Sequence, residues 1–362
     1  MNSNSEIRVL IYEPVGTGHR FYYVRLLIEA ALKRGDTVAV GLTRESFNCP
    51  EYKLHLKHFE SQISMYIATS NDLSSIESIS EKFRADLTVI PDGDIFARRL
   101  IRKGKWRGAG RLSILIMRER SQNRSNPVRV WVDNSLKKSI FTMASRMNSV
   151  KIVILKSSTW KGVSNYSVAR DPVSSFTTSE SIRSIRESWQ IEDSKHWFGI
   201  FGNVDMRKNL SLIAQSIALL HRSEIGILIA GQCQQEALDE AGEYLDNLRE
   251  SGVKVVVVNR ILTDLEMDSA IAAVDTAVLA HSNESPSGIL GKAVVAGTDV
   301  VAAGAITLKE DAKMIPQNAI WCPLDMYDLK IALEKSMERS GTVSPLAGLG
   351  ADQFTSELLS TN

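Results

Sequence analysis

Two basic residues lie where a helix is expected to begin. Arg207 and Lys208 follow a turn that opens at Gly202, and they directly precede an apolar helical pattern that starts at Leu210. Basic side chains are disfavoured at helix N-termini, because the helix dipole is positive there. Two cations placed against this preference indicate a bound anion, such as a diphosphate. The alternative is that both side chains are simply exposed on the surface.

A second candidate for an anion site lies between Leu279 and Gly304. An apolar strand runs into a polar loop whose one acid is Glu284, and a short apolar helix and another apolar strand follow. Backbone N–H groups at the start of such a helix readily bind phosphate. The alternative is an ordinary strand–helix–strand unit that holds no ligand.

Two shorter motifs lie in the first half of the chain. The segment Gly16–His19 (GTGH) follows an apolar strand, and its glycines let the backbone approach a ligand closely. Phe21 replaces the third glycine of a dinucleotide fingerprint, so NAD is not expected, and a plain tight turn is the alternative. Asp92 and Asp94 have the spacing of carboxylates that hold a divalent ion, but a helix N-cap by either aspartate is the favoured interpretation.

The histidines and cysteines predict no metal site. The six histidines show no ligand spacing, and the three cysteines are far apart, which indicates a reducing compartment. The N-terminal segment lacks the apolar core of a signal peptide, and no apolar run approaches the roughly 18 residues that cross a bilayer. With 44% hydrophobic and 23% charged residues, the composition is that of a globular protein, which we expect to be cytoplasmic.

The charge is unevenly distributed along the chain. Between Ala97 and Lys161 there are seventeen basic residues and two acidic ones, although the whole chain has a net charge of only +1. Such a block indicates an anionic partner, and a solvated basic face is the alternative. The predicted helix Ile95–Trp106 carries five of these cations among apolar residues, a composition that suits an anionic membrane surface. Nucleic acid is not expected, because no nucleic-acid-binding motif accompanies the charge.

The motifs lie in two series of alternating strands and helices, joined by a linker from Arg170 to Ser181. This alternation predicts two α/β domains with parallel sheets, and ligands in such folds bind beyond the carboxyl ends of the strands. The segment Glu51–Arg84 is expected to be mostly helical, and helices are also expected at Leu210–Leu220 and Asn134–Asn148. The predicted strands are Ile7–Tyr12, Thr37–Leu42, Leu87–Ile90, Leu112–Met117, Lys151–Leu155, Trp197–Phe201, Ile225–Ala230, Lys254–Val258, Thr276–Leu279 and Ala319–Trp321.

The second series resembles the retaining, nucleotide-sugar-dependent glycosyltransferases of GT-B fold, of the family-4 (group 1) type. The resemblance rests on FGNVDMRKNLSLIAQSI, ILIAGQ and NESPSGILGKAVVAGTDVVA, and more loosely on the N-terminal Gly-x-Gly-His. It implies two Rossmann-like domains that face each other across a cleft. The expected boundaries are 1–172 for the acceptor-side domain, 173–340 for the nucleotide-sugar domain, and 341–362 for a tail that returns to the first domain.

The resemblance also implies roles for individual residues. Lys208 aligns with the lysine that binds the donor diphosphate, and Glu284 aligns with the glutamate that contacts the donor sugar. Together with Arg207 they form the expected catalytic group. Further donor-binding residues are expected at Gly16, Gly18, Asn203, Arg260, Ile261, Ser287, Gly288, Ile289, Leu290 and Lys292, and acceptor-side residues at His19, Asp92, Asp94 and Arg118.

Several positions depart from the family's pattern. The arginine that follows the first strand of the second domain is Asn203 here, so Arg207 is expected to supply its charge. The second glutamate, which contacts the ribose, is Lys292, and a proline further on is Asp299. In the first domain, Arg118 stands near the position of a frequent histidine. The first two departures bear on nucleotide affinity, and they leave open a catalytically inactive relative.

The function implied by the resemblance is the transfer of a hexose from a UDP- or GDP-linked sugar to a hydroxyl acceptor, as in polysaccharide biosynthesis. The acceptor is expected to be a glycan, a glycolipid or a small molecule, lipid-linked or anionic, with peripheral membrane contact through Ile95–Trp106. Transfer is expected to retain the anomeric configuration and to need no metal or other cofactor. Two alternatives stay open: an inactive GT-B scaffold that binds a partner, and a metal-dependent transferase that uses Asp92 and Asp94. The oligomeric state is not predicted.

Overall fold

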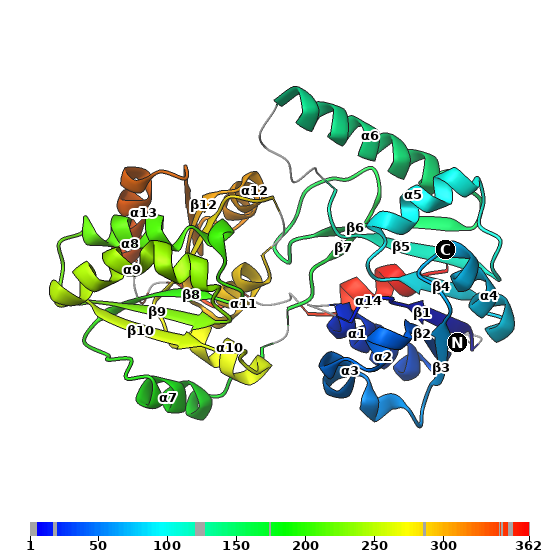
Figure 1. Cartoon of the computed structure of the whole chain (residues 1–362), viewed down its shortest axis with the longest axis horizontal. Helices are drawn as coiled ribbons and strands as arrows, with labels where there is room; N and C mark the ends of the chain where they lie inside the picture. The colour runs from blue at the N-terminus through cyan, green and yellow to red at the C-terminus, as the bar shows by residue number, and fades with distance from the viewer. Residues whose placement is uncertain are drawn as a thin grey trace. The chain divides into compact units, whose positions relative to one another are not determined.

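The computed structural model describes residues 6–16, 20–119, 127–173, 175–284, 287–339, 341, 343–346 and 350–361. The chain separates into two compact units (Figure 1). Unit 1 comprises Met1–Lys156, Gly162–Pro172 and Ala351–Asn362, and unit 2 comprises Ser157–Lys161 and Val173–Gly350. Each unit is built around one parallel sheet with helices, so the predicted α/β fold class is confirmed.

Unit 1 has a seven-stranded parallel sheet in the order β3-β2-β1-β4-β5-β6-β7. Apolar side chains pack on both of its faces, which is the burial pattern of a doubly wound sheet. The strands are β1 (Arg8–Tyr12), β2 (Thr37–Thr43), β3 (Ser64–Ala68), β4 (Leu87–Ile90), β5 (Arg111–Ile116), β6 (Val150–Lys156) and β7 (Ser167–Arg170). The helices are α1 (Arg20–Arg34), α2 (Arg44–Phe47), α3 (Pro50–His55), η1 (Lys57–Phe59), α4 (Leu73–Phe83), α5 (Asp94–Lys103), α6 (Pro127–Ser145) and α14 (Asp352–Leu359).

The last helix, α14, packs against α1 and against the edge strand β7 of unit 1. The amide of Gln353 accepts a hydrogen bond from the N–H of Arg170 and donates one to the carbonyl of Val168, both at 2.7 Å. The ring of Phe354 lies 4.9 Å from that of Tyr23, centroid to centroid, and both are buried. The final helix therefore completes the core of the unit that the N-terminus begins.

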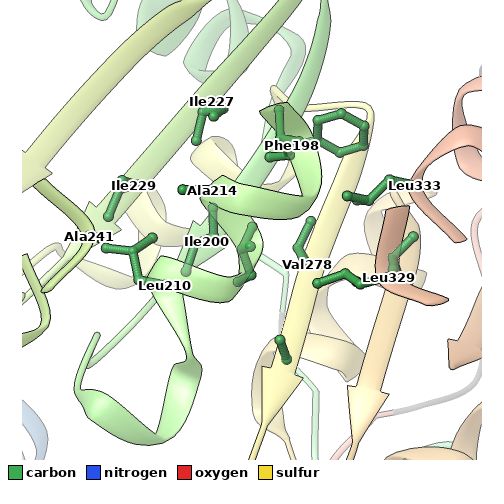
Figure 2. Close-up of a cluster of buried hydrophobic side chains, with 14 of the residues drawn as sticks. Phe198, Ile200, Leu210, Ala214, Ile227, Ile229, Ala241, Val278, Leu329 and Leu333 are labelled. Carbon is green, nitrogen blue, oxygen red and sulfur yellow. The ribbon is translucent and has the colours of Figure 1, made fainter. Parts of the chain in front are cut away.

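Unit 2 has a six-stranded parallel sheet in the order β10-β9-β8-β11-β12-β13. Apolar clusters cover both faces, and Figure 2 shows side chains of β8, β9 and β11 that meet residues of α8, α9 and α13. The strands are β8 (His196–Phe201), β9 (Ile225–Gly231), β10 (Lys254–Asn259), β11 (Thr276–His281), β12 (Asp299–Gly304) and β13 (Ala319–Cys322). The helices are α7 (Ser179–Ser188), η2 (Met206–Lys208), α8 (Leu210–Ala218), α9 (Gln235–Glu250), α10 (Asp264–Ala272), α11 (Gly288–Ala296), α12 (Ile306–Met314) and α13 (Met326–Glu338).

Some elements differ from the sequence-based expectation. The segment expected to be mostly helical contains the strand β3, in which only Ala68 is fully buried, so its apolar signal is weak. The strand β7 is four residues long, and its last residue, Arg170, is the first residue of the expected linker. Helix α6 begins at Pro127, earlier than predicted, because proline suits the first turn of a helix. Helix α5 ends at Lys103, since Gly104 adopts a left-handed conformation with φ of 83°.

Helix α5 uses its apolar residues for the core of unit 1. Phe96 and Leu100 are buried, whereas Ile95 is exposed. The apolar side chains that were expected to serve a membrane surface are therefore largely committed to packing. Over the part of the chain that the structure describes, no helix combines the length and the apolar character needed to span a bilayer.

Candidate functional site

The carboxyl edge of the sheet in unit 2 brings two of the predicted segments together. The N–H of Ser282 donates a 3.0 Å hydrogen bond to the carbonyl of Arg207, and the side-chain amide of Asn209 donates one of 2.8 Å to the carbonyl of Ala280. The turn after β8 is thus fastened to the loop after β11. Ligands of doubly wound sheets bind at this edge, so the location suits the predicted donor site.

Lys208 is a half-buried cation of this edge. Its ammonium group donates a hydrogen bond to the carbonyl of Phe201, the last residue of β8. A Cβ atom placed on Gly202 would lie 3.4 Å from the Lys208 Nζ and 3.9 Å from the side chain of Ile289, so these residues surround one small volume. Burial lowers the pKa of Lys208 to about 8, while Asp205 opposes this shift. An anion beside Nζ would raise this pKa again, because it stabilises the charged form.

Arg207 has a partner within the chain. Its guanidinium forms a 2.5 Å ion pair with Asp205, whose carboxylate also accepts the N–H of Arg207 at 3.1 Å. Both basic residues lie in the short helix η2, and α8 begins only at Leu210, after Asn209 in a left-handed conformation. Both cations therefore lie directly before a helix that begins at Leu210, as predicted, but Arg207 is already paired with Asp205, so the case for a bound anion rests on Lys208.

His281 is a residue of this edge that the sequence did not single out. It is the last residue of β11 and only 9% exposed, and neither ring nitrogen has a hydrogen-bond partner among the described residues. Burial lowers its pKa to about 4, and the charges of Lys208 and Arg207 add to this effect, whereas Asp205 opposes it. The imidazole is therefore neutral at pH 7. A polar residue at the carboxyl end of an apolar strand was the available signal.

Glu284 is buried and supports a helix. Its two carboxylate oxygens accept the N–H groups of Ile306 and Thr307, at 2.9 and 3.0 Å. These N–H groups open α12, whose N-cap residue, Ala305, has no side-chain acceptor. The structure thus gives Glu284 a capping role that the sequence did not suggest. Its contact with a donor sugar stays a prediction.

The start of α11 has the geometry expected for a phosphate site. Ser287 is the N-cap residue, and its hydroxyl oxygen accepts the N–H of Leu290 at 3.4 Å. Gly288 and Ile289 form the first turn, where N–H groups point away from the helix toward its N-terminal end. Leu290 is buried in the core of unit 2, which fixes the helix against the sheet.

Lys292 is held by an acid from another helix. Its ammonium group forms an ion pair with Asp268 of α10, and the other oxygen of Asp268 accepts the N–H of Phe176 at 3.0 Å. Asp268 is only 3% exposed. The lysine at the position of the expected ribose-binding acid therefore joins α10, α11 and the segment before α7. Asp268 was missed, because nothing in its sequence context separates it from a surface acid.

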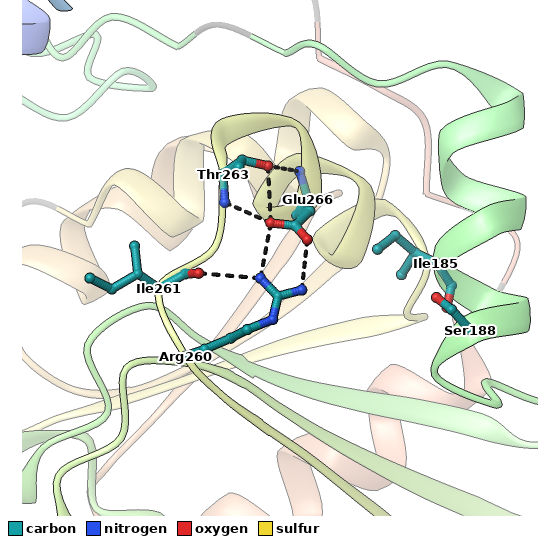
Figure 3. Close-up of polar contacts among 6 residues, drawn as sticks. All are labelled: Ile185, Ser188, Arg260, Ile261, Thr263 and Glu266. Atoms are coloured by element: carbon teal, nitrogen blue, oxygen red, sulfur yellow. Dashed lines mark hydrogen bonds and ion pairs between the residues drawn. The ribbon is translucent and has the colours of Figure 1, made fainter. Parts of the chain in front are cut away.

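The loop after β10 is fixed by a network around Arg260 (Figure 3). The guanidinium binds both carboxylate oxygens of Glu266, at 2.6 and 3.1 Å, and donates to the carbonyl of Ile261 at 3.2 Å. Thr263 and Glu266 form a capping box for α10, and the pKa of Glu266 falls to about 2 chiefly because of its hydrogen bonds from Arg260. Ile261 is 77% exposed, so the network presents an apolar side chain to solvent. Asn203, in the turn after β8, is also exposed.

In unit 1, Gly16 is required by packing. A Cβ atom there would collide with the sulfur of Cys49. Gly18 and His19 lie outside the described residues. Glu13 is a buried acid that sequence analysis did not single out. It directly follows β1 and is 1% exposed. One of its oxygens accepts the N–H of Val15 at 3.0 Å, and burial raises its pKa to about 8.

Asp92 and Asp94 have separate partners. Asp92 forms a 2.7 Å ion pair with Arg20, and Asp94 accepts the N–H groups of Met117 and Arg118, at 2.9 and 3.4 Å. The N-cap of α5 is Gly93, so the expectation that either aspartate caps this helix was wrong. Burial raises the pKa of Asp94, and Asp92 adds to the effect. Among the residues that the structure describes, no cluster of three His, Cys, Asp or Glu side chains could hold a metal ion.

The architecture is shared with solved glycosyltransferases, although no family model and no curated protein sequence matches the chain. HepE from Anabaena, in complex with UDP, is 15% identical, with a TM-score of 0.65 over 98% of this chain and 96% of that one. Sucrose-phosphate synthase from Thermosynechococcus elongatus is 11% identical, with a TM-score of 0.68 over 98% and 95%. A glycosyltransferase from Rickettsia africae is 11% identical, with a TM-score of 0.66 over 97% and 92%. The chain therefore has the two-sheet α/β fold of these GT-B proteins.

Proposed function

We propose that this protein transfers a hexose from a nucleoside diphosphate sugar, UDP- or GDP-linked, to a hydroxyl acceptor. The observation that carries the proposal is the half-buried side chain of Lys208, whose ammonium group lies at the carboxyl edge of the sheet in unit 2, beside Gly202 and the first turn of α11. A cation next to helix-start N–H groups is suited to a diphosphate. The likeness to HepE, which has been solved with UDP-glucose, supports this choice of donor.

The proposed reaction retains the anomeric configuration and needs no metal. The bond between the sugar C1 and the diphosphate oxygen breaks, and the acceptor oxygen forms its bond to C1 on the same face. The acceptor proton passes to the departing diphosphate, so the protein supplies no nucleophile. Lys208 and the N–H groups of Gly288 and Ile289 stabilise the charge that develops on the diphosphate, and Arg207 adds positive potential from its pair with Asp205.

The decisive variant is Lys208→Gln, which removes the charge and keeps a similar length. We expect transfer to fall about 100-fold or more, because one preorganised electrostatic contact contributes at about this level. Release of UDP and GDP from a panel of donor sugars measures it, with calorimetry for nucleotide binding. Lys335→Gln is the matched control, since Lys335 is exposed on α13 and should leave both quantities unchanged.

The outcomes separate the open alternatives. Binding of UDP or GDP without turnover of any donor would favour the inactive scaffold, for which the pairing of Lys292 with Asp268 is the supporting observation. Absence of both binding and turnover would refute the proposal. Activity that disappears in EDTA and returns with a divalent cation would favour the metal-dependent alternative, with Asp92 and Asp94 as its candidate ligands.

A further inference from the structure

Unit 1 contains a pocket of about 480 Å³ with a strongly basic lining. It lies beside α5 and α6, which pack against each other (Figure 1). Its cations come from three places in the chain: α5, α6 and the residue that follows Met117, after the end of β5. They are Arg98, Arg99, Arg102, Arg118 and Lys137, and the one acid of the lining is Asp94.

Three of these five cations have no counter-charge among the residues that the structure describes. Within the described ranges, the guanidinium groups of Arg98, Arg102 and Arg118 make no ion pair and no hydrogen bond. Lys137 donates to the carbonyl of Arg118 at 2.9 Å, which is a neutral acceptor. The carboxylate of Asp94 already binds the N–H groups of Met117 and Arg118. The lining therefore has five basic side chains against one acidic one, and this excess concentrates positive potential in the pocket.

The cations also disfavour one another. Burial lowers the pKa of Lys137, and the charges of Arg98 and Arg118 lower it further, whereas Asp94 and Asp133 oppose the shift. Like charges that surround one cavity are unfavourable until an anion enters it. Guanidinium groups match the oxygens of phosphate in a two-pronged hydrogen-bonding geometry, and three unpaired ones face this pocket.

We propose that this pocket binds a phosphate-bearing group, either a phosphomonoester or a diphosphate. The phosphate-bearing group is assigned to the acceptor substrate. This assignment rests on the proposed function. The pocket lies in unit 1, whereas Lys208 and the proposed donor site lie in unit 2. The two sites are therefore separate features of the chain, and each can be disabled without touching the other.

An exposed apolar row on α6 bears on the source of the phosphate. Its members recur at helical spacing on the face opposite Lys137 and Phe141, and their exposed fractions run from 49% to 70%. They are Val128, Trp131, Val132, Leu136 and Met143. A phosphate carried by a lipid and a phosphate carried by a soluble molecule share the chemistry that the pocket recognises. The apolar row offers a lipid-borne phosphate a second contact, through its acyl chains. The experiment therefore has one arm for a soluble phosphate and one for a lipid-borne phosphate.

The first arm is calorimetric titration of the full chain with inorganic pyrophosphate, with UDP present at saturation to occupy the donor site. We expect one pyrophosphate site, weakened about tenfold or more in Arg98→Gln and in Arg118→Gln. Arg107→Gln is the matched control, because Arg107 is exposed in the same basic segment but does not line the pocket. Circular dichroism verifies that each variant is folded. Absence of pyrophosphate binding, or equal binding by Arg98→Gln and the wild type, would overturn the assignment.

This arm also separates the inference from the proposed function. If UDP fails to bind and no donor is turned over, pyrophosphate is titrated alone into wild type, Lys208→Gln and Arg98→Gln. Binding that survives Lys208→Gln and is lost in Arg98→Gln establishes the pocket while the donor proposal fails. Binding that is lost only in Lys208→Gln refutes the pocket and leaves the donor site.

The second arm is flotation with vesicles of phosphatidylcholine that contain phosphatidic acid, which displays a phosphomonoester. Flotation that is lost in Arg98→Gln and in Leu136→Ser supports the pocket with phosphate carried by a lipid. Pyrophosphate binding without flotation supports the same pocket with a soluble phosphorylated ligand. Flotation that is unchanged in Arg98→Gln and Arg118→Gln contradicts the assignment of the phosphomonoester to this pocket.

Discussion

Single buried polar residues of this protein are held in charge states that differ from those in water. Glu13 has a raised pKa and His281 a lowered one, and burial is the largest cause for both. Desolvation disfavours the charged form of either group, so both tend to be neutral near pH 7. Neither residue belongs to a recognisable motif. Their burial follows from the strands that precede them, and it could be established only from the structure.

Glu13 makes the stability of unit 1 depend on pH. Its folded pKa is about 8, against about 4.5 in the unfolded chain, so the folded state holds a proton that the unfolded state has lost between these values. Stability therefore falls as pH rises from about 4.5 to 8. Glu13→Gln removes this dependence, and we expect it to be more stable than wild type at pH 8 by roughly 3–5 kcal/mol. Urea unfolding at pH 5 and pH 8 measures the difference.

The control for this experiment is Glu81→Gln, because Glu81 is exposed on α4. This variant should follow the wild-type pH profile. Equal stability of Glu13→Gln and wild type at pH 8 would contradict the raised pKa of Glu13.

Short helices of unit 2 are fastened by acids from other segments. Glu284 binds the N–H groups that open α12, and Asp268 binds Lys292 of α11. The start of α12 lacks a capping side chain of its own, so an acid 22 residues earlier in the chain replaces it. A sequence pattern that looks for a cap within the helix's own first turn cannot find such a contact.

The capping role of Glu284 changes what its removal would mean. Glu284→Ala leaves two helix-start N–H groups without their acceptor, so we expect a loss of about 1–3 kcal/mol in the stability of unit 2. Glu284→Gln keeps one acceptor oxygen and should lose less. Chemical unfolding of both variants, beside transfer rates under conditions where each is folded, separates the two roles. Loss of transfer in Glu284→Gln with near wild-type stability supports the sugar contact, whereas unchanged stability in Glu284→Ala would refute the capping role.

At the scale of the whole molecule, the order of strands and helices could be predicted where strands are fully buried. The runs that became β1, β9 and β11 are mostly apolar and buried at all but the first residue of β1, and the prediction of two parallel α/β sheets drew on such runs. The edge strands β3 and β7 were missed, because one is partly exposed and the other is four residues long. Edge strands depend on long-range partners that local patterns do not reveal.

The candidate site was predictable to a smaller extent. Sequence spacing selected Lys208 and the start of α11, and the structure brings the segments that carry them to one edge of a sheet. The counter-charges Asp205 and Asp268 and the unpaired His281 were not selected. Their importance comes from which neighbour each one meets, and that is set by tertiary packing.

The return of the last helix to unit 1 is a property of the whole chain, and it predicts an uneven response to mutation. Phe354 of α14 is fully buried against Tyr23, so Phe354→Ala should cost about 3–5 kcal/mol. The loss should be confined to unit 1, since α14 contacts α1 and strands of that unit. Hydrogen exchange measured by mass spectrometry should show faster exchange in β1 and β7 and unchanged exchange in β8 and β9.

Phe176→Ala, at a half-exposed phenylalanine of unit 2, is the control and should leave both sheets protected. Equal loss of protection in the two sheets would mean that the units unfold together, which would contradict their separate cores.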